Sequence, residues 1–189
     1  MNKDIDKYKK GFTLIEVLVS VAIFSLLIAG PTGFFISSLK GQKKALSSQE
    51  LIDSTSYFLE YFSRAVRMAQ KDSLSSCLTN SFVKTNYELT EGPGIKFMNY
   101  KGECQEIYLD AEEKILKEKR GVSDPISLTS SNLEVVSFQI RLSGETQSDN
   151  LQPKVTILLK MRGKSQAEDM RPEISIQTTI SQRNLDVEE

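Results

Sequence analysis

One carboxylate within an apolar segment is the side chain of this sequence with the clearest chemical significance. Glu16 lies in the run from Phe12 to Gly30, where only Thr13, Ser20 and Ser25 are also polar. A charged side chain at the centre of a bilayer costs about 2.5–3.5 kcal/mol on insertion scales. An acid in such a segment is by default a functional residue, and Glu16 is therefore a candidate for pairing with a cation.

The rest of the composition offers little for catalysis. The 189 residues include no histidine and two cysteines, and 24 Lys and Arg nearly balance 25 Asp and Glu. Histidine is the commonest general base and metal ligand, and two thiolates alone are too few for a metal site. No nucleophile, P-loop or metal-binding motif stands out, so we expect no enzyme, no cofactor and no metal. The net charge of −1 also disfavours direct nucleic-acid binding.

The element that carries Glu16 is predicted to be a membrane-spanning helix. At about 1.5 Å per residue the run extends about 28 Å, close to the roughly 30 Å of a bilayer core. Lysines precede the run at positions 3, 7, 9 and 10. The positive-inside rule then predicts a single pass through the cytoplasmic membrane, with the N-terminus in the cytoplasm and the following domain outside.

Two ordinary kinds of export segment fit this run less well. A cleaved secretory signal would need a small-residue site near Ala29, but apolar residues continue to Leu39. A plain signal anchor accounts for the hydrophobicity and the charge bias but leaves Glu16 unexplained.

The residues around Glu16 resemble a known signal. The stretch "KKGFTLIEVLVS" is similar to the class III signal of type IV pilins and type II secretion pseudopilins. That signal has a short basic leader ending in glycine (Gly11), a new N-terminal aromatic residue (Phe12) and a glutamate at the fifth mature position (Glu16). The resemblance implies that prepilin peptidase cuts between Gly11 and Phe12 and methylates the new amine. The leader, residues 1–11, is then removed while the apolar segment stays.

The resemblance also implies a role for Glu16 in assembly. In this family the acid pairs with the N-terminal amine of a neighbouring subunit, which stays largely cationic near neutral pH even when methylated. The implied partners are prepilin peptidase, other pilin or pseudopilin subunits, the inner-membrane assembly platform and, before assembly, membrane lipid. The alternative is that Glu16 faces a water defect or reaches toward the cytoplasmic interface.

Helical periodicity continues beyond the span. We expect a transmembrane and assembly helix over residues 12–39, bent at Gly30 and Pro31 because proline removes a backbone donor. An amphipathic continuation is expected over residues 40–72, or else a separate helix after a short break. The apolar positions of this continuation are Leu46, Leu51, Tyr57, Phe58, Phe62, Ala65, Val66 and Ala69.

Alternating patterns predict an antiparallel β-sheet domain over residues 73–189. Short strands are expected near residues 82–89, 94–100, 105–110 and 114–119, and the charged stretch 112–120 is interpreted as the solvated edge of a strand. Three later runs predict the strongest meander, with one apolar face each: Val136, Phe138, Ile140 and Leu142; Val155, Ile157, Leu159 and Met161; Ile174, Ile176 and Ile180. The fold class is therefore α+β, a long N-terminal helix packed on an antiparallel sheet, which is also what the resemblance implies.

The two cysteines and two polar loops complete the prediction. In an exported domain Cys77 and Cys104 could form a disulfide worth about 3 kcal/mol, with two free thiols as the alternative. Residues 143–153 and 162–172 are candidates for exposed contact surfaces, although plain solvated hairpin tips fit them equally well.

The subclass rests on a shorter likeness. Major pilins, minor pilins, type II secretion pseudopilins and competence subunits share this N-terminus. The ending "ISIQTTISQRNL" and the large sheet domain are similar to J-type or W-type minor subunits. The sequence therefore favours a minor pilin or pseudopilin of a filament for adhesion, motility, secretion or DNA uptake. The alternative class is a signal-anchored extracytoplasmic binding or enzymatic domain whose pilin-like N-terminus is fortuitous.

Overall fold

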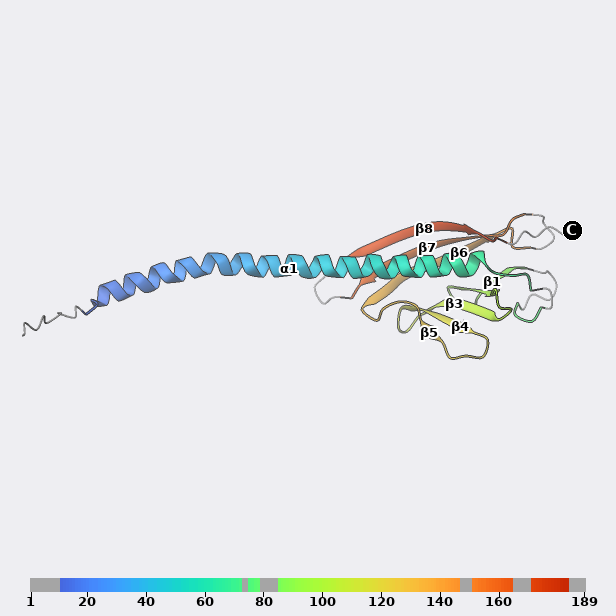
Figure 1. The fold of residues 1–189 in the computed structure, drawn as a ribbon, viewed down its shortest axis with the longest axis horizontal. Helices are drawn as coiled ribbons and strands as arrows, with labels where there is room; N and C mark the ends of the chain where they lie inside the picture. The colour runs from blue at the N-terminus through green and yellow to red at the C-terminus, as the bar shows by residue number, and fades with distance from the viewer. Residues whose placement is uncertain (1–10, 73–74, 79–84, 147–150, 165–170, 184–189) are drawn as a thin grey trace, which may run out of the picture. The chain divides into compact units, whose positions relative to one another are not determined.

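The computed structural model describes residues 11–72, 75–78, 85–146, 151–164 and 171–183. The chain divides into two compact units, Met1–Lys43 and Lys44–Glu189. One helix, α1 (Leu14–Arg67), contributes to both units, and the strands belong to the second (Figure 1). Three predictions fall wholly or partly outside the described residues: the leader apart from Gly11, the start of the strand expected at 82–89, and parts of the two polar loops.

In the first unit, α1 is apolar and exposed. Among the described residues it is the one helix long and apolar enough to cross a membrane, and its most apolar window is not buried inside the protein. The helix is continuous through Gly30 and Pro31, as expected for a bend that does not end it, and the kink itself stays a prediction. In the described part of the first unit, residues 11–43, the surface of this apolar helix is therefore left exposed.

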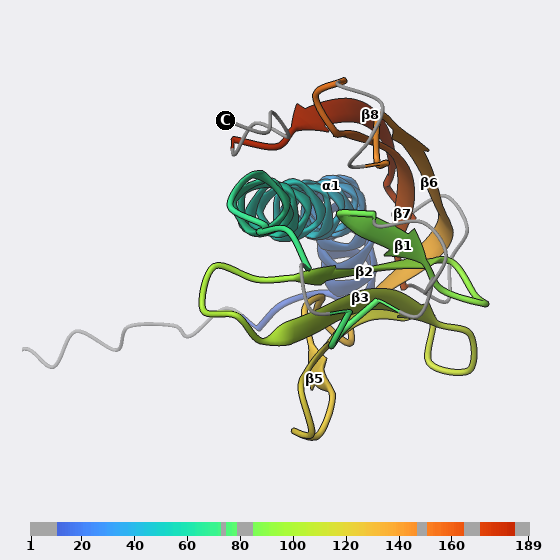
Figure 2. The same cartoon turned by 90° about the vertical axis from the view of Figure 1, so that its right-hand side faces the viewer.

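The second unit holds two antiparallel sheets, where one was predicted. The first has the order β1-β2-β3-β4-β5 and the second β6-β7-β8. Their bounds are β1 (Tyr87–Leu89), β2 (Gly94–Met98), β3 (Cys104–Asp110), β4 (Ile115–Arg120), β5 (Ile126–Ser127), β6 (Leu133–Ser143), β7 (Lys154–Gly163) and β8 (Glu173–Ser181). Figure 2 looks along the helix and shows the sheets on two sides of the part of α1 that lies in this unit. The predicted α+β architecture is confirmed.

The core forms where one stripe of α1 meets both sheets. Phe58, Phe62 and Val66 recur at helical spacing and are fully buried. The rings of Phe58 and Phe62 each meet Phe138 of β6 edge-on, with centroids 6.1 and 6.3 Å apart. Two positions assigned to this stripe from the sequence are wrong: Leu46 and Tyr57 are 66% and 65% exposed. Both lie off the buried face, so periodicity identified the stripe but overestimated its width.

The predicted meander is confirmed, with one correction. β7 buries Val155, Ile157, Leu159 and Met161, as the alternation predicted. In β6, however, the register shifts between Val135 and Ser137, and Val135 is buried while Val136 is 42% exposed. A β-bulge inserts one extra residue and so reverses the inward alternation on one side of it.

The charged stretch 112–120 is not the edge predicted for it. β4 lies between β3 and β5, and it buries Ile115, Leu116 and Glu118. Composition indicated a solvated strand because charges of both signs surround two apolar residues. The charged side chains are instead accommodated by partners such as Asp110, which lies 2.8 Å from Lys117 Nζ.

A disulfide joins Cys77 to Cys104, across a sequence separation of 27 residues. It ties the segment after α1 to the first residue of β3. We expect replacement of both cysteines by alanine to lower the free energy of unfolding by about 3 kcal/mol, because the unfolded chain regains the entropy of an open loop. Urea denaturation with and without a thiol reductant measures the effect. The reductant should destabilise the parent protein and leave the double-alanine variant unchanged.

Asp72 organises the same segment and makes its stability depend on pH. Its carboxylate accepts backbone N–H groups of Ser76, Cys77 and Leu78 at 3.0, 2.7 and 2.9 Å. Burial would raise the pKa of Asp72, but these hydrogen bonds together outweigh it and hold the pKa below its ordinary value.

A carboxylate with a lowered folded-state pKa stabilises the protein fully above its unfolded-state pKa and loses that contribution as pH falls through the folded value. We therefore expect the urea midpoint to fall below about pH 4, and to fall less steeply in Asp72→Asn. Parallel pH profiles of the two proteins would contradict this role for Asp72.

Candidate functional site

The start of α1 is closed by a reciprocal pair of hydrogen bonds between Thr13 and Glu16. The backbone N–H of Glu16 donates to Thr13 Oγ1 at 3.4 Å, and the backbone N–H of Thr13 donates to Glu16 Oε2 at 3.3 Å. Thr13 also approaches Glu16 Oε2 through its hydroxyl, at 3.3 Å. This is a capping box, in which the N-cap residue and the third helical residue each satisfy a backbone donor that the helix leaves unpaired.

Glu16 therefore has a local structural role that the sequence reasoning missed. The signal was present, because Thr13-x-x-Glu16 before an apolar run is the pattern of a capping box. A carboxylate in the first turn is also favoured by the positive end of the helix dipole. The cap does not need the full negative charge, since the side-chain oxygen of a glutamine can accept the same hydrogen bond at this position.

Gly11 and Phe12 lie in the non-helical segment before α1. Phe12 is 84% exposed, and no heavy atom of the described residues other than the chain neighbours lies within 4 Å of the place where a Cβ on Gly11 would stand. The peptide bond between them is thus in open, irregular backbone next to a capped helix. A peptidase can reach such a bond without unwinding the helix.

The other polar side chains of the apolar segment are satisfied within their own helix. The hydroxyls of Ser20, Ser25 and Thr32 donate to the carbonyl oxygens four residues earlier, at 2.7 to 2.8 Å. Such hydroxyls need no partner from outside the helix. Glu16 differs from them in carrying a charge that its cap does not neutralise.

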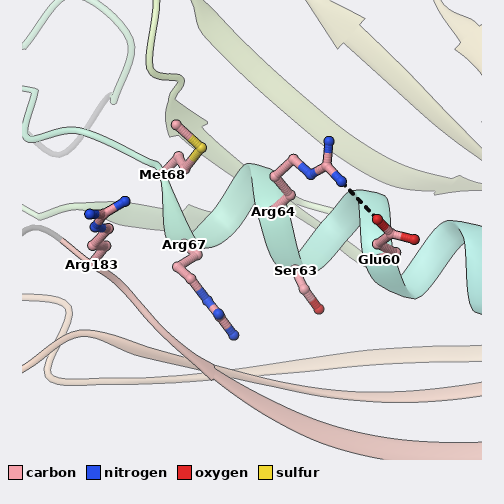
Figure 3. Close-up of a pocket in the computed structure, with 6 residues that line it drawn as sticks. All are labelled: Glu60, Ser63, Arg64, Arg67, Met68 and Arg183. Atoms are coloured by element: carbon pink, nitrogen blue, oxygen red, sulfur yellow. Dashed lines mark hydrogen bonds and ion pairs between the residues drawn. The ribbon is translucent and has the colours of Figure 1, made fainter.

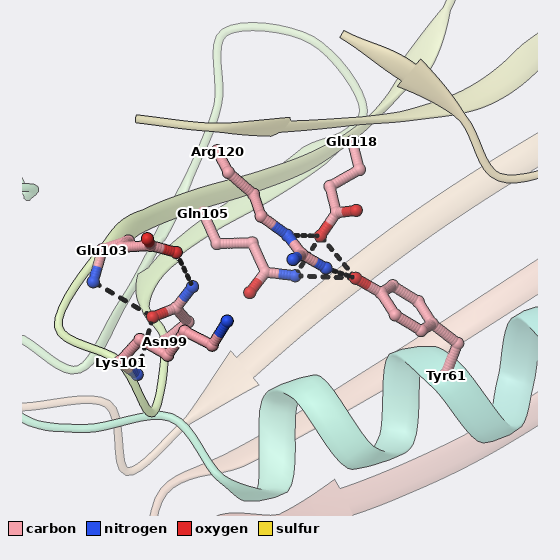
Figure 4. Close-up of polar contacts among 7 residues, drawn as sticks. All are labelled: Tyr61, Asn99, Lys101, Glu103, Gln105, Glu118 and Arg120. Atoms are coloured by element: carbon pink, nitrogen blue, oxygen red, sulfur yellow. Dashed lines mark hydrogen bonds and ion pairs between the residues drawn. The ribbon is translucent and has the colours of Figure 1, made fainter. Parts of the chain in front are cut away.

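A polar network in the second unit is the other notable constellation (Figure 4). The buried Glu118 Oε1 accepts hydrogen bonds from Tyr61 Oη at 2.5 Å, Gln105 Nε2 at 2.5 Å and Arg120 Nε at 2.9 Å. Burial and the hydrogen bond to Glu118 raise the pKa of Tyr61. The hydrogen bonds to Glu118 and Tyr61 raise the pKa of Arg120. The network holds α1 against the first sheet through the paired carboxylate of Glu118 and the protonated side chains of Tyr61 and Arg120. These groups supply no nucleophile.

The predicted site residues thus fall into three places. Gly11, Phe12 and Glu16 lie together at the start of α1, and Cys77 and Cys104 are joined in the second unit. Gly30 and Pro31 lie inside the helix.

Comparison with known families finds one match. Residues 6–30 match the family described as the prokaryotic N-terminal methylation motif. No curated protein and no solved structure matches the chain. The matched segment contains Gly11, Phe12 and Glu16, and it confirms the resemblance seen in the sequence. Together with the apolar helix it indicates a membrane-anchored, single-pass protein. The N-terminal segment of this chain is a prepilin signal of the kind carried by type IV pilins and pseudopilins.

Proposed function

We propose that this chain is a minor pilin or pseudopilin, a non-catalytic structural subunit of a type IV pilus-like filament. Prepilin peptidase removes residues 1–11 and methylates Phe12. The apolar half of α1 first anchors the subunit in the cytoplasmic membrane, with its N-terminus in the cytoplasm, and then enters the filament core. The observation that carries the proposal is the methylation motif at residues 6–30, whose described part consists of the non-helical residues 11–13 and the start of the capped apolar helix.

The exposed apolar surface of the first unit supports the proposal, because such a surface must be covered by other molecules. Phe24, Leu26 and Phe34 are 63%, 76% and 78% exposed, and the side chains between them are exposed as well. A contiguous apolar surface of this kind on a polar protein marks a membrane or protein contact. Lipid before assembly and neighbouring helices afterwards would provide that cover in turn.

The deciding experiment is intact-mass and N-terminal analysis of the protein from membranes of cells with and without a prepilin peptidase. The expected result is a chain that begins at methylated Phe12 only when the peptidase is present. A chain that retains residues 1–11 in both strains would overturn the proposal. It would instead favour a signal-anchored extracytoplasmic binding or enzymatic domain.

Two variants of Glu16 separate its charge from its capping role. Glu16→Gln keeps an acceptor for the backbone N–H of Thr13 but loses the charge, whereas Glu16→Ala loses both. If the carboxylate pairs with a neighbouring subunit's amine, both variants are processed normally and both lose most of their incorporation into filaments. Cleavage is measured by mass and incorporation by immunoblotting of sheared filaments. Normal incorporation of Glu16→Gln with reduced incorporation of Glu16→Ala would show that the cap alone matters.

A further inference from the structure

The C-terminal end of α1 carries a hollow lined by three arginines. Arg64, Arg67 and Arg183 surround a space of about 300 Å³, together with Met68, Ser63 and Glu60 (Figure 3). Arg64 and Arg67 come from the last turn of the helix, and Arg183 follows β8. The backbone N–H of Arg183 donates to the carbonyl of Arg67 at 2.8 Å, which places the two residues side by side.

Among the residues that the structure describes, few groups compensate this positive charge. Arg67 and Arg183 are exposed, and neither forms an ion pair with any residue that the structure describes. Arg64 is paired with Glu60 at 2.7 Å, but both side chains are about 70% exposed. An ion pair so accessible to water contributes little and can be exchanged for another anion.

A second hollow of about 420 Å³ adjoins the first and shares Arg64 and Met68 with it. Its other walls include Tyr61, Tyr100 and Arg120. Met68 and Tyr100 are 40% and 55% exposed, and Lys101 Nζ lies 5.7 Å from the centre of the Tyr100 ring. Apolar surface thus lies beside guanidinium groups in both hollows. We call this region the arginine surface: Arg64, Arg67, Met68, Tyr100, Arg120 and Arg183.

Stabilisation of the helix explains only part of the arginine surface. Cations in the last turn of a helix interact favourably with its negative end, which accounts for Arg64 and Arg67. It does not account for Arg183, which lies outside the helix, nor for the exposed side chains of Met68 and Tyr100 that line the hollows. Exposed aromatic and methionine side chains next to arginines are the composition of protein-binding surfaces.

We propose that the arginine surface binds a short acidic peptide segment of another protein, one in which carboxylate side chains alternate with apolar ones. The apolar side chains enter the two hollows, against Met68 and Tyr100. The carboxylates pair with Arg67 and Arg183, whose planar guanidinium groups suit bidentate contacts to carboxylate. The chain as a whole carries a net charge of −1, so this cluster of arginines is a local excess of positive charge. The proposal goes beyond the filament role and does not depend on it.

The test uses the full-length chain in detergent micelles and two labelled synthetic peptides. One peptide alternates leucine with glutamate, and the matched one alternates leucine with glutamine. Fluorescence anisotropy should show that the acidic peptide binds about tenfold or more tightly than the neutral one. Arg67→Glu/Arg183→Glu should weaken binding of the acidic peptide about tenfold or more. Tyr100→Ala should weaken binding of both peptides, because it removes an apolar wall.

A matched control carries the same change of charge elsewhere. Lys119→Glu/Lys154→Glu replaces two exposed lysines of the two sheets and should leave the affinity nearly unchanged. Equal binding of the two peptides, or equal losses in the two double variants, would overturn the proposal. So would displacement of the acidic peptide by inorganic phosphate or an oligothymidylate at similar concentration, since either would show a site for anions in general.

Discussion

Replacing Gly11 by valine is expected to abolish cleavage between residues 11 and 12 and to leave the protein in the membrane with its leader attached. The peptide bond lies in irregular backbone just before the cap of α1. A protease must approach the backbone on both sides of the bond it cuts, and a β-branched side chain at Gly11 obstructs that approach. The expected result is complete retention of the leader in the presence of prepilin peptidase, measured by intact mass.

The structure indicates that Gly11→Val would act on recognition by the peptidase and not on folding. Among the described residues, no heavy atom beyond the chain neighbours lies within 4 Å of a Cβ at Gly11, so valine there meets no steric obstacle in the folded protein. Gly33→Val is the matched control, because a Cβ at Gly33 also meets no neighbour and the residue lies within α1. The control should be cleaved at the normal rate. Normal cleavage of Gly11→Val would show that this glycine does not define the processing site.

Replacing Phe62 by alanine is expected to lower the free energy of unfolding by about 3–5 kcal/mol. The side chain is fully buried, and its ring contacts Phe58 with centroids 5.6 Å apart and Phe138 at 6.3 Å. Truncation removes buried apolar surface and opens a cavity where α1 meets β6. Urea denaturation in detergent, followed by tyrosine fluorescence, measures the change.

Tyr57→Ala on the same helix is the control for this experiment. Its side chain is 65% exposed, so removing it should change the free energy of unfolding by no more than about 0.5 kcal/mol. Equal destabilisation by the two substitutions would contradict the placement of the core on the Phe62 stripe. The contrast also tests the corrected width of that stripe, because Tyr57 was assigned to it from the sequence.

The sequence was most informative where a pattern is local. The prepilin signal is read from consecutive residues, and the alternation in β7 and β8 reflects the pleat of a single strand. Helical spacing identified Phe58, Phe62 and Val66 for the same reason. These features could be predicted because each depends on its own segment and on one apolar face.

The features that were missed depend on partners remote in the chain or on one inserted residue. Glu118 is buried where Tyr61 on α1 and Arg120 on the same strand donate hydrogen bonds to its Oε1, and the composition of the stretch 112–120 gives no sign of a helix that lies against it. The division into two sheets depends on which strands pair, and the alternation of apolar and polar residues along a strand does not determine its partner. The bulge at Val136 reversed a pattern that was otherwise regular.

The hydroxyls of Ser20, Ser25 and Thr32 have one more consequence. Since each bonds to a carbonyl of its own helix, the segment presents almost the same inert surface to any apolar surroundings, whether acyl chains or other helices. Passing from one to the other then requires no exchange of hydrogen bonds along most of its length. The free energy of the segment should therefore be nearly the same in lipid as among other helices. The charge of Glu16 is the feature that distinguishes these two surroundings.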